Sequence, residues 1–208
     1  MNKGLANDIK QVFEGIAETR KELLTSWAND YWGHLERLKT ELEATTAHAA
    51  EGTESRGPVK GVERMLASSY AKGADWTELF VLDRERKVVA STYPAHEGVA
   101  YGAESLLAAA LDYSEAGGDR PCLYGPYADP MTATIGPRSS SFHDKMTLLF
   151  IYPIVRDGTS LRYLCGRVPN DVIGDLIQRE SGHVYPDSGD NYIFMAQPKL
   201  SARIAPGT

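Results

Sequence analysis

Aromatic side chains that could line a ligand site fall on or beside the apolar segments that follow residue 75. A concave sheet that carries such rings and a few charges is typical of a site for a small polar ligand. Asp129 could meet an amine of that ligand, and Arg167 could hold a carboxylate through its two-pronged guanidinium. The predicted contacts are Trp76, Tyr93, Tyr124, Tyr127, Asp129, Tyr152 and Arg167, with Tyr163 as a further aromatic neighbour. The alternative is structural, because tyrosine packs well in strands and Arg167 could pair with a local acid such as Asp171.

Residues that would indicate catalysis or metal binding are scattered. The chain has no glycine-rich phosphate loop before a helix, no His-Glu-x-x-His and no Gly-x-Ser-x-Gly. His143 and Asp144 lack the further ligands that a metal-dependent hydrolase needs, and the acidic run 187–190 lacks the spacing of an EF-hand. The sequence therefore predicts a protein that is not an enzyme and carries no metal or cofactor. An enzyme with a dispersed active site is the alternative.

Length and composition indicate a globular chain of one substantial domain or slightly more. It has 208 residues, of which 42% are hydrophobic and 24% are charged. Its net charge of −6 disfavours contact with phosphate backbones, so no nucleic-acid partner is expected. No apolar run reaches the length of about 18 residues that a membrane helix needs, and no signal peptide is recognised. We therefore expect either a cytosolic protein or the soluble part of a longer one.

A long helix is expected over residues 4–47. Its apolar residues recur mostly at steps of three and four, and no proline interrupts them. At 1.5 Å per residue the helix would extend roughly 66 Å, which is more than one small domain needs. Part of the pattern follows a heptad, so two interpretations stand: a seam with a second copy of the chain, or one long core-facing helix in a monomer. A second helix is expected over 59–71.

The remaining pattern predicts an antiparallel sheet. Residues 77–92 have the pattern of two apolar strands joined by a charged turn. Further strands are expected over 122–127, 145–155 and 161–168, and a last strand over 191–196. Helices are expected over 104–113 and after Pro169. Loops are expected over 93–102, 132–143 and 181–189. Together these predict an α+β fold of five antiparallel strands with helices on one side. Cys122 and Cys165 are expected to be buried thiols in strands, or a pair if those strands bring them together.

The order of these elements resembles the Cache domains, the PAS-like sensory modules of bacterial methyl-accepting chemotaxis receptors. The resemblance rests on residues 78–92, 125–132, 147–155 and 164–176, and it covers about 60–180. It implies three parts: a long N-terminal helix over 1–50, a Cache module over 58–181, and the start of a second module or a C-terminal extension over 182–208. Because the last part is similar to the first strand of a membrane-proximal module, 58–181 would be the membrane-distal part of a double Cache domain.

The resemblance also implies a ligand site. In the members that bind amino acids, an Arg-x-x-Tyr-like segment, a Tyr-x-Asp and a later Asp hold the ligand. Arg120 with Tyr124 loosely matches the first, and Tyr127 with Asp129 matches the second. Arg167 stands where the later Asp is expected, which would favour a ligand with a carboxylate or another anionic group. Arg120 thus joins the predicted ligand-binding residues.

The function implied by the resemblance is that of an extracytoplasmic sensor. The chain would be the periplasmic ligand-binding domain of an inner-membrane chemoreceptor. It would bind an amino acid, organic acid or amine, and pass a conformational signal through the long helix. The alternatives are a cytosolic PAS-like small-molecule sensor and the input domain of a histidine kinase or diguanylate cyclase.

Overall fold

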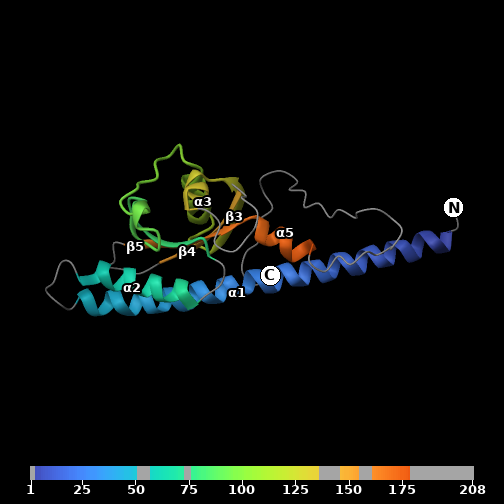
Figure 1. Ribbon diagram of the computed structural model, residues 1–208, viewed down its shortest axis with the longest axis horizontal. Coiled ribbons are helices and arrows are strands. Elements are labelled where there is room, and N and C mark those ends of the chain that lie inside the picture. Colours follow the sequence, from blue (N-terminus) through green and yellow to red (C-terminus); the bar gives the residue numbers. More distant parts are fainter. Residues whose placement is uncertain (1–2, 51–56, 73–75, 136–145, 155–160, 179–208) are drawn as a thin grey trace.

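The computed structural model describes residues 3–50, 57–72, 76–135, 146–154 and 161–178. They form a layer of long helices, a five-stranded sheet, and a third layer of short helices and loops (Figure 1). Among the described helices, none combines the length and the apolarity needed to cross a membrane.

The helical layer consists of α1 (Lys3–Ala50) and α2 (Gly57–Lys72). The 48 residues of α1 correspond to about 72 Å, and the helix extends well past the sheet at its N-terminal end (Figure 1). In its C-terminal half the buried residues recur at helical spacing and include Leu35, Leu38 and Leu42. Helix α2 packs along this half. The short helix α5 (Asp171–Gln178) also contacts α1.

The sheet is antiparallel, with the strand order β2-β1-β5-β4-β3. The strands are β1 (Glu78–Asp83), β2 (Val88–Ser91), β3 (Cys122–Ala128), β4 (Met146–Pro153) and β5 (Leu161–Pro169). The last strand in sequence thus lies at the centre and pairs with the first, so that Arg167 lies directly opposite Glu78.

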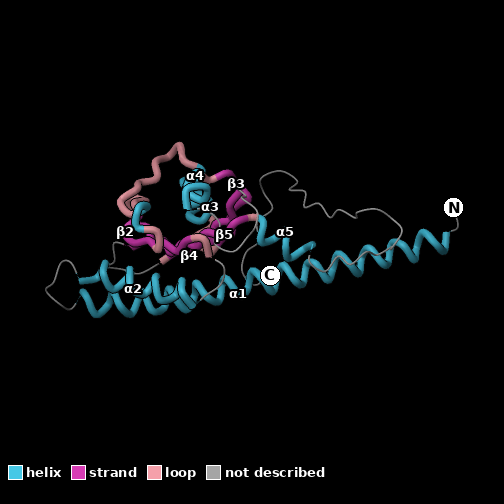
Figure 2. The backbone as a smooth tube through the Cα atoms, viewed as in Figure 1, coloured by secondary structure: helices cyan, strands magenta, loops and turns pink. Residues whose placement is uncertain are grey.

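Both faces of the sheet are covered. Alternating strand residues send Leu79, Phe150 and Leu164 toward α1 and α2, and send Phe80 and Leu149 to the other face. That second face, here called the α3 face, is covered by α3 (Leu106–Ala116), by η1 (Pro94–His96), by α4 (Pro130–Ile135) and by the loop that arches from β2 to α3 (Figure 2). The prediction that the helices lie on one side is wrong, because the strands are apolar on both faces and both must be buried.

The predicted elements are otherwise confirmed within a few residues. The long helix, the hairpin, the three later strands and the helix after Pro169 all form. The prediction of a loop from residue 132 is wrong at its start, because α4 continues to Ile135. The predicted loop at 181–189, the strand at 191–196 and the segment 182–208 lie outside the described residues.

The two cysteines do not form a pair. Cys122 on β3 and Cys165 on β5 are both buried thiols. Both lie opposite Ile151, so the whole of β4 separates them. Two strand spacings amount to about 10 Å, beyond the reach of a disulfide. The structure therefore selects the interpretation of two buried thiols.

Candidate functional site

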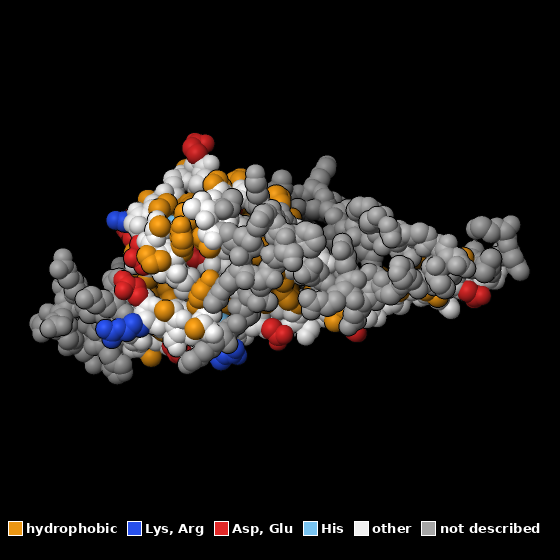
Figure 3. Space-filling model, in the orientation of Figure 1, with side chains coloured by type: hydrophobic (Ala, Val, Ile, Leu, Met, Phe, Trp, Pro, Cys, Tyr) orange, Lys and Arg blue, Asp and Glu red, His pale blue; other side chains and the backbone are white. Residues whose placement is uncertain are grey.

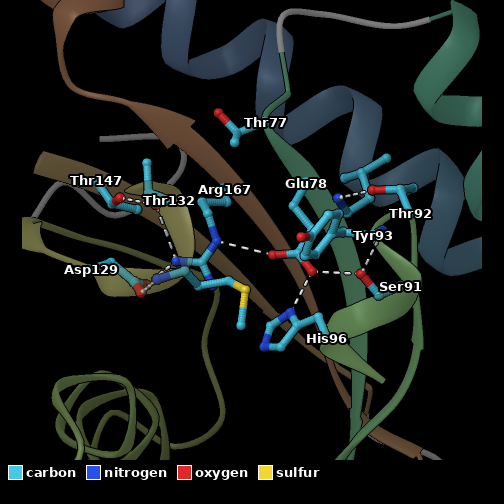
Figure 4. Close-up of polar contacts among 12 residues, drawn as sticks. Thr77, Glu78, Ser91, Thr92, Tyr93, His96, Asp129, Thr132, Thr147 and Arg167 are labelled. Carbon is cyan, nitrogen blue, oxygen red and sulfur yellow. Dashed lines mark hydrogen bonds and ion pairs between the residues drawn. The ribbon is translucent and has the colours of Figure 1, made fainter. Parts of the chain in front are cut away.

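A buried cation lies at the centre of the α3 face. Arg167 stands two positions after Cys165 on β5, and its guanidinium lies 5.4 Å from the ring centroid of Phe80. Its side chain is fully buried, and burying an unpaired charge would be prohibitively costly. Polar side chains therefore surround it, and together with Arg167 they are called the Arg167 cluster: Glu78, Ser91, His96, Asp129, Thr132 and Thr147 (Figure 4).

Glu78 closes one side of the cluster. Arg167 Nε donates to Glu78 Oε2 at 3.0 Å. The other carboxylate oxygen accepts a hydrogen bond from Ser91 Oγ at 2.5 Å and contacts His96 Nδ1. The far nitrogen of His96 contacts the hydroxyl of Tyr101 in the loop above. Glu78 thus links the guanidinium on β5 to the hairpin and to the covering loop.

Asp129 closes the other side. It forms an ion pair with Arg167 Nη1 through Oδ2, which also accepts a hydrogen bond from the Tyr127 hydroxyl at 2.9 Å. Its second oxygen accepts from the backbone N–H of Met131 at 2.9 Å, which fixes Asp129 at the start of α4. Thr132 lies 3.5 Å from Arg167 Nη1. Arg167 Nη2 has no hydrogen-bond acceptor among the described residues.

An irregularity in β3 brings its tyrosines to this face. Tyr124 pairs with Leu149 and Tyr127 pairs with Thr147, so three residues of β3 span two residues of β4. This extra residue reverses the alternation of the strand, and both tyrosines reach the α3 face with their ring centroids 5.6 Å apart. Gly125 makes the bend feasible, since its φ is +126° and a Cβ there would lie 2.5 Å from the carbonyl oxygen of Thr147.

Electrostatics favour the charged forms of Glu78 and Arg167. Burial opposes the charge of Glu78, but its hydrogen bond with His96 and the positive charge of Arg167 outweigh burial and lower its pKa. Burial also opposes the charge of Arg167, but its oxygen-bearing neighbours, Tyr127 and Asp129 foremost, raise its pKa. Burial raises the pKa of Tyr127 well above its ordinary value, so this hydroxyl remains a neutral donor to Asp129.

Five of the eight predicted ligand-binding residues belong to this region. Asp129 and Arg167 form the ion pair, and Tyr127, Tyr124 and Tyr93 lie beside it. The backbone N–H of Tyr93 donates to Ser91 Oγ at 2.9 Å, which places this residue next to Glu78 (Figure 4). The further aromatic neighbour, Tyr163, is buried on the same face.

The other three predicted residues lie elsewhere. Trp76 and Tyr152 face α1 on the opposite side of the sheet, and Arg120 is exposed just before β3. The structure therefore does not bring these three to the Arg167 cluster. The alternative pairing of Arg167 with Asp171 is wrong, because its partners are Glu78 and Asp129.

Sequence analysis missed five members of the cluster, of which Glu78 and His96 lie next to Arg167 or to its acid partner; the other three are Ser91, Thr132 and Thr147. Glu78 shares the phase of Phe80 and Leu82 on β1, and an acid in phase with buried residues of a strand was the available signal. His96 offered no such signal, because it lies outside the strands at the end of η1 and contacts Glu78 only in the folded chain.

The two acids of the Arg167 cluster already pair with its arginine. Within the described residues, no group of three or more acidic, histidine or cysteine side chains could hold a metal ion. The cluster therefore brings charged and hydroxyl side chains together on two sides of a buried guanidinium.

Comparisons with known proteins agree on the fold alone. No family model matches the sequence, and no curated protein sequence matches it either. An extracellular ligand binding receptor from Desulfohalobium retbaense is similar in structure, with a TM-score of 0.54 and 14% identity over 79% of this chain and 26% of that chain. The sensor domain of the V. cholerae histidine kinase DctB has a TM-score of 0.53 and 13% identity over 84% of this chain and 61% of that chain.

The fold is therefore that of the Cache-type sensory domains. The chain spans less than two thirds of the length of either of these two structures.

Proposed function

We propose that the chain is the extracytoplasmic ligand-binding domain of a transmembrane chemoreceptor. The observation that carries this proposal is a Cache-type fold with a closed, charged cluster on the face of the sheet away from α1. A fully buried ion pair contributes little to stability compared with apolar packing, so its presence is better explained by recognition than by folding.

The ligand in this proposal carries an amine, a carboxylate or both. In this proposal an ammonium of the ligand approaches Asp129, the acid of the Arg167 cluster that keeps slight exposure. Arg167 Nη2 is a donor without an acceptor among the described residues, and a ligand carboxylate could take that place. The tyrosines of β3 supply the contact area beside these charges.

Signal transfer in this proposal runs through α1. Tyr31 on α1 stacks on Phe150 of β4 with their ring centroids 5.3 Å apart, and Trp32 meets the same ring edge-on at 4.8 Å. A ligand that shifts β5 or β4 therefore acts on the long helix through rigid aromatic contacts. Because one similar structure is a histidine kinase sensor domain, the input domain of a kinase is the second candidate.

A screen for thermal stabilisation by amino acids, organic acids and amines tests the binding proposal. The strongest hit is then titrated by calorimetry against the wild type, Asp129→Asn and the exposed control Arg120→Gln. We expect Asp129→Asn to weaken binding at least tenfold and Arg120→Gln to leave it unchanged. The proposal fails if no compound binds, or if the Asp129→Asn protein binds the hit as tightly as the wild type.

The membrane context is tested separately. A hydrophobic segment of membrane-spanning length in the gene on either side of this sequence is expected for a receptor. Its absence from the full gene would favour a cytosolic sensor without changing the ligand experiment.

A further inference from the structure

A pocket of about 530 Å³ lies between α1 and α2, in the layer on the other side of the sheet from the Arg167 cluster. This volume is within the range of small-molecule sites. The lining residues that matter are Asp30, Gly33, His34, Arg37 and Glu41 of α1 and Ser69 of α2. None of them belongs to the ligand site considered so far.

The charges of the pocket alternate along one face of α1. Asp30, Arg37 and Glu41 are separated by seven and four residues, so they project from the same side of the helix. Along the axis the cation lies about 10 Å from the first acid and about 6 Å from the second. Among the described residues none of these three side chains has an ion-pair partner. A molecule with charges of both signs would complement this row.

The floor of the pocket is open because residue 33 has no side chain. A Cβ at Gly33 would meet only Arg37 Nη1, at 3.6 Å. Glycine inside a helix costs about 1 kcal/mol relative to alanine. The glycine therefore leaves room beside the guanidinium at a cost to the helix.

The wall of the pocket is connected to the sheet. Trp76 Nε1, which can only donate, bonds to His34 Nδ1 at 2.8 Å. His34 is therefore neutral with its proton on Nε2, which donates to Ser69 Oγ at 2.5 Å. Burial and then the charge of Arg37 lower the pKa of His34, which agrees with this tautomer. The chain of hydrogen bonds joins α2 to α1 and to Trp76, which lies two residues before the start of β1.

We propose that the pocket between α1 and α2 binds a small zwitterion, whose carboxylate pairs with Arg37 and whose ammonium pairs with Glu41 or Asp30. A molecule held there also contacts the His34–Ser69 wall, and through Trp76 it reaches Gly166, the neighbour of Arg167. The pocket is thus a second ligand site that can influence the Arg167 cluster from the opposite face.

The experiment uses probes in which only the separation of the charges changes. Glycine, β-alanine, 4-aminobutyrate and 6-aminohexanoate are titrated into the protein by calorimetry, with acetate and methylamine as probes of one charge each. We expect at least one ω-amino acid to bind, and both single-charge probes to bind at least tenfold more weakly. In ¹⁵N-labelled protein the indole N–H signal of Trp76, assigned with Trp76→Phe, shifts on binding.

Matched variants locate the site. Arg37→Gln is expected to weaken binding at least tenfold, and Gly33→Leu to abolish it by filling the floor. Gly15→Leu, the same change at an exposed glycine of the same helix with nothing within 4 Å, is expected to have no effect. The inference is overturned if no probe binds, or if binding is weakened by Asp129→Asn and unaffected by Arg37→Gln, because the probe would then occupy the Arg167 cluster.

Discussion

Arg167 has two carboxylate partners of its own, and this defines what a ligand must do at the site. Glu78 and Asp129 hold the guanidinium from opposite sides, and both carboxylates are anchored by further hydrogen bonds. In the proposed function, a ligand carboxylate would have to bind Nη2, which has no acceptor among the described residues, or displace one of the two acids. Asp129 is the more easily displaced, because it stands at the junction of β3 and α4 and keeps slight exposure, whereas Glu78 lies fully buried inside the sheet.

Removing the cation should destabilise the fold strongly. Arg167→Met leaves two buried carboxylates without a counter-charge, and such a change costs about 3–5 kcal/mol of unfolding free energy. Urea unfolding followed by circular dichroism measures it. The control Arg120→Met replaces an exposed arginine and is expected to stay within about 0.5 kcal/mol of the wild type. A loss below about 1 kcal/mol in Arg167→Met would contradict the ion pairs described for the cluster.

Glu78 should give the protein a specific sensitivity to acid. Its pKa in the folded state is lowered from the ordinary 4.5, because its hydrogen bond with His96 and the charge of Arg167 outweigh the effect of burial. The ionised carboxylate therefore stabilises the fold above pH 4.5, and this stability is lost as the pH falls through the lowered pKa. Urea unfolding at a series of pH values is expected to show a shallower acid slope for Glu78→Gln than for the wild type. The exposed control Glu104→Gln should keep the wild-type slope, and a wild-type slope in Glu78→Gln would contradict the prediction.

How far the site could be predicted differs from residue to residue. Asp129 and Arg167 were recognisable from the sequence because Asp129 follows an apolar strand, Arg167 lies late in another, and both carry charges that need a partner. Their pairing was not recognisable, since it depends on β5 lying between β1 and β4, which local patterns do not specify. Trp76 was expected at the ligand site because it is aromatic and flanks the hairpin. Aromatic character, however, gives no information on which face of the sheet a residue packs against.

At the scale of elements, one close contact fixes how α1 and the sheet meet. The indole of Trp76 covers Gly166 on β5, and a Cβ there would lie 2.6 Å or less from ring carbons of the tryptophan. The same indole meets Tyr31 of α1 edge-on, with ring centroids 4.6 Å apart. The glycine thus allows β5 and the long helix to share one aromatic side chain.

Gly166→Ala tests this contact. The added methyl group must displace a buried ring, which we expect to cost about 1–3 kcal/mol of unfolding free energy and to alter the near-ultraviolet circular dichroism of the tryptophans. Gly102→Ala places the same methyl group in open space and should change neither quantity. Equal stability of the two variants would show that Trp76 does not pack on β5 as described.

The elements themselves were largely predictable, and their arrangement was less so. The spacing of apolar residues marks the long helix and the five strands because each buries one stripe or face. The helices on both faces were not foreseen, since a strand that is apolar on both sides has the same sequence pattern wherever its covering helices lie. The bulge at Gly125 was also missed, although it determines that Tyr124 and Tyr127 share a face.

At the scale of the whole molecule, α1 is the element that joins the parts. It contacts α2, α5, β4 and β5, while its N-terminal third projects beyond the sheet (Figure 1). On the face shown in Figure 3, the acidic and basic side chains of the described residues stand singly among neutral ones. The projecting part of α1 is distinguished by apolar side chains that are exposed. Val12 and Phe13 are 47% and 62% exposed, and Ile9 is exposed beside them.

We expect a dimer through this part of α1. Ile9, Val12 and Ile16 follow the alternating steps of three and four of a heptad seam, and an exposed apolar stripe on a projecting helix is stabilised when a second copy covers it. Sedimentation equilibrium over a range of protein concentrations should show a monomer–dimer equilibrium in the wild type. Replacing two seam residues, Ile9→Glu with Val12→Glu, should weaken association at least tenfold, because each dimer would bury four carboxylates of like charge.

The matched control adds the same charge to the opposite side of the same helix. Asn7→Glu with Gln11→Glu lies away from the seam, and this protein should associate as the wild type does. If both double variants weaken association equally, net charge rather than the seam governs it. If the wild type stays monomeric at all concentrations, the second interpretation of the sequence holds, and α1 is a long core-facing helix of a monomer.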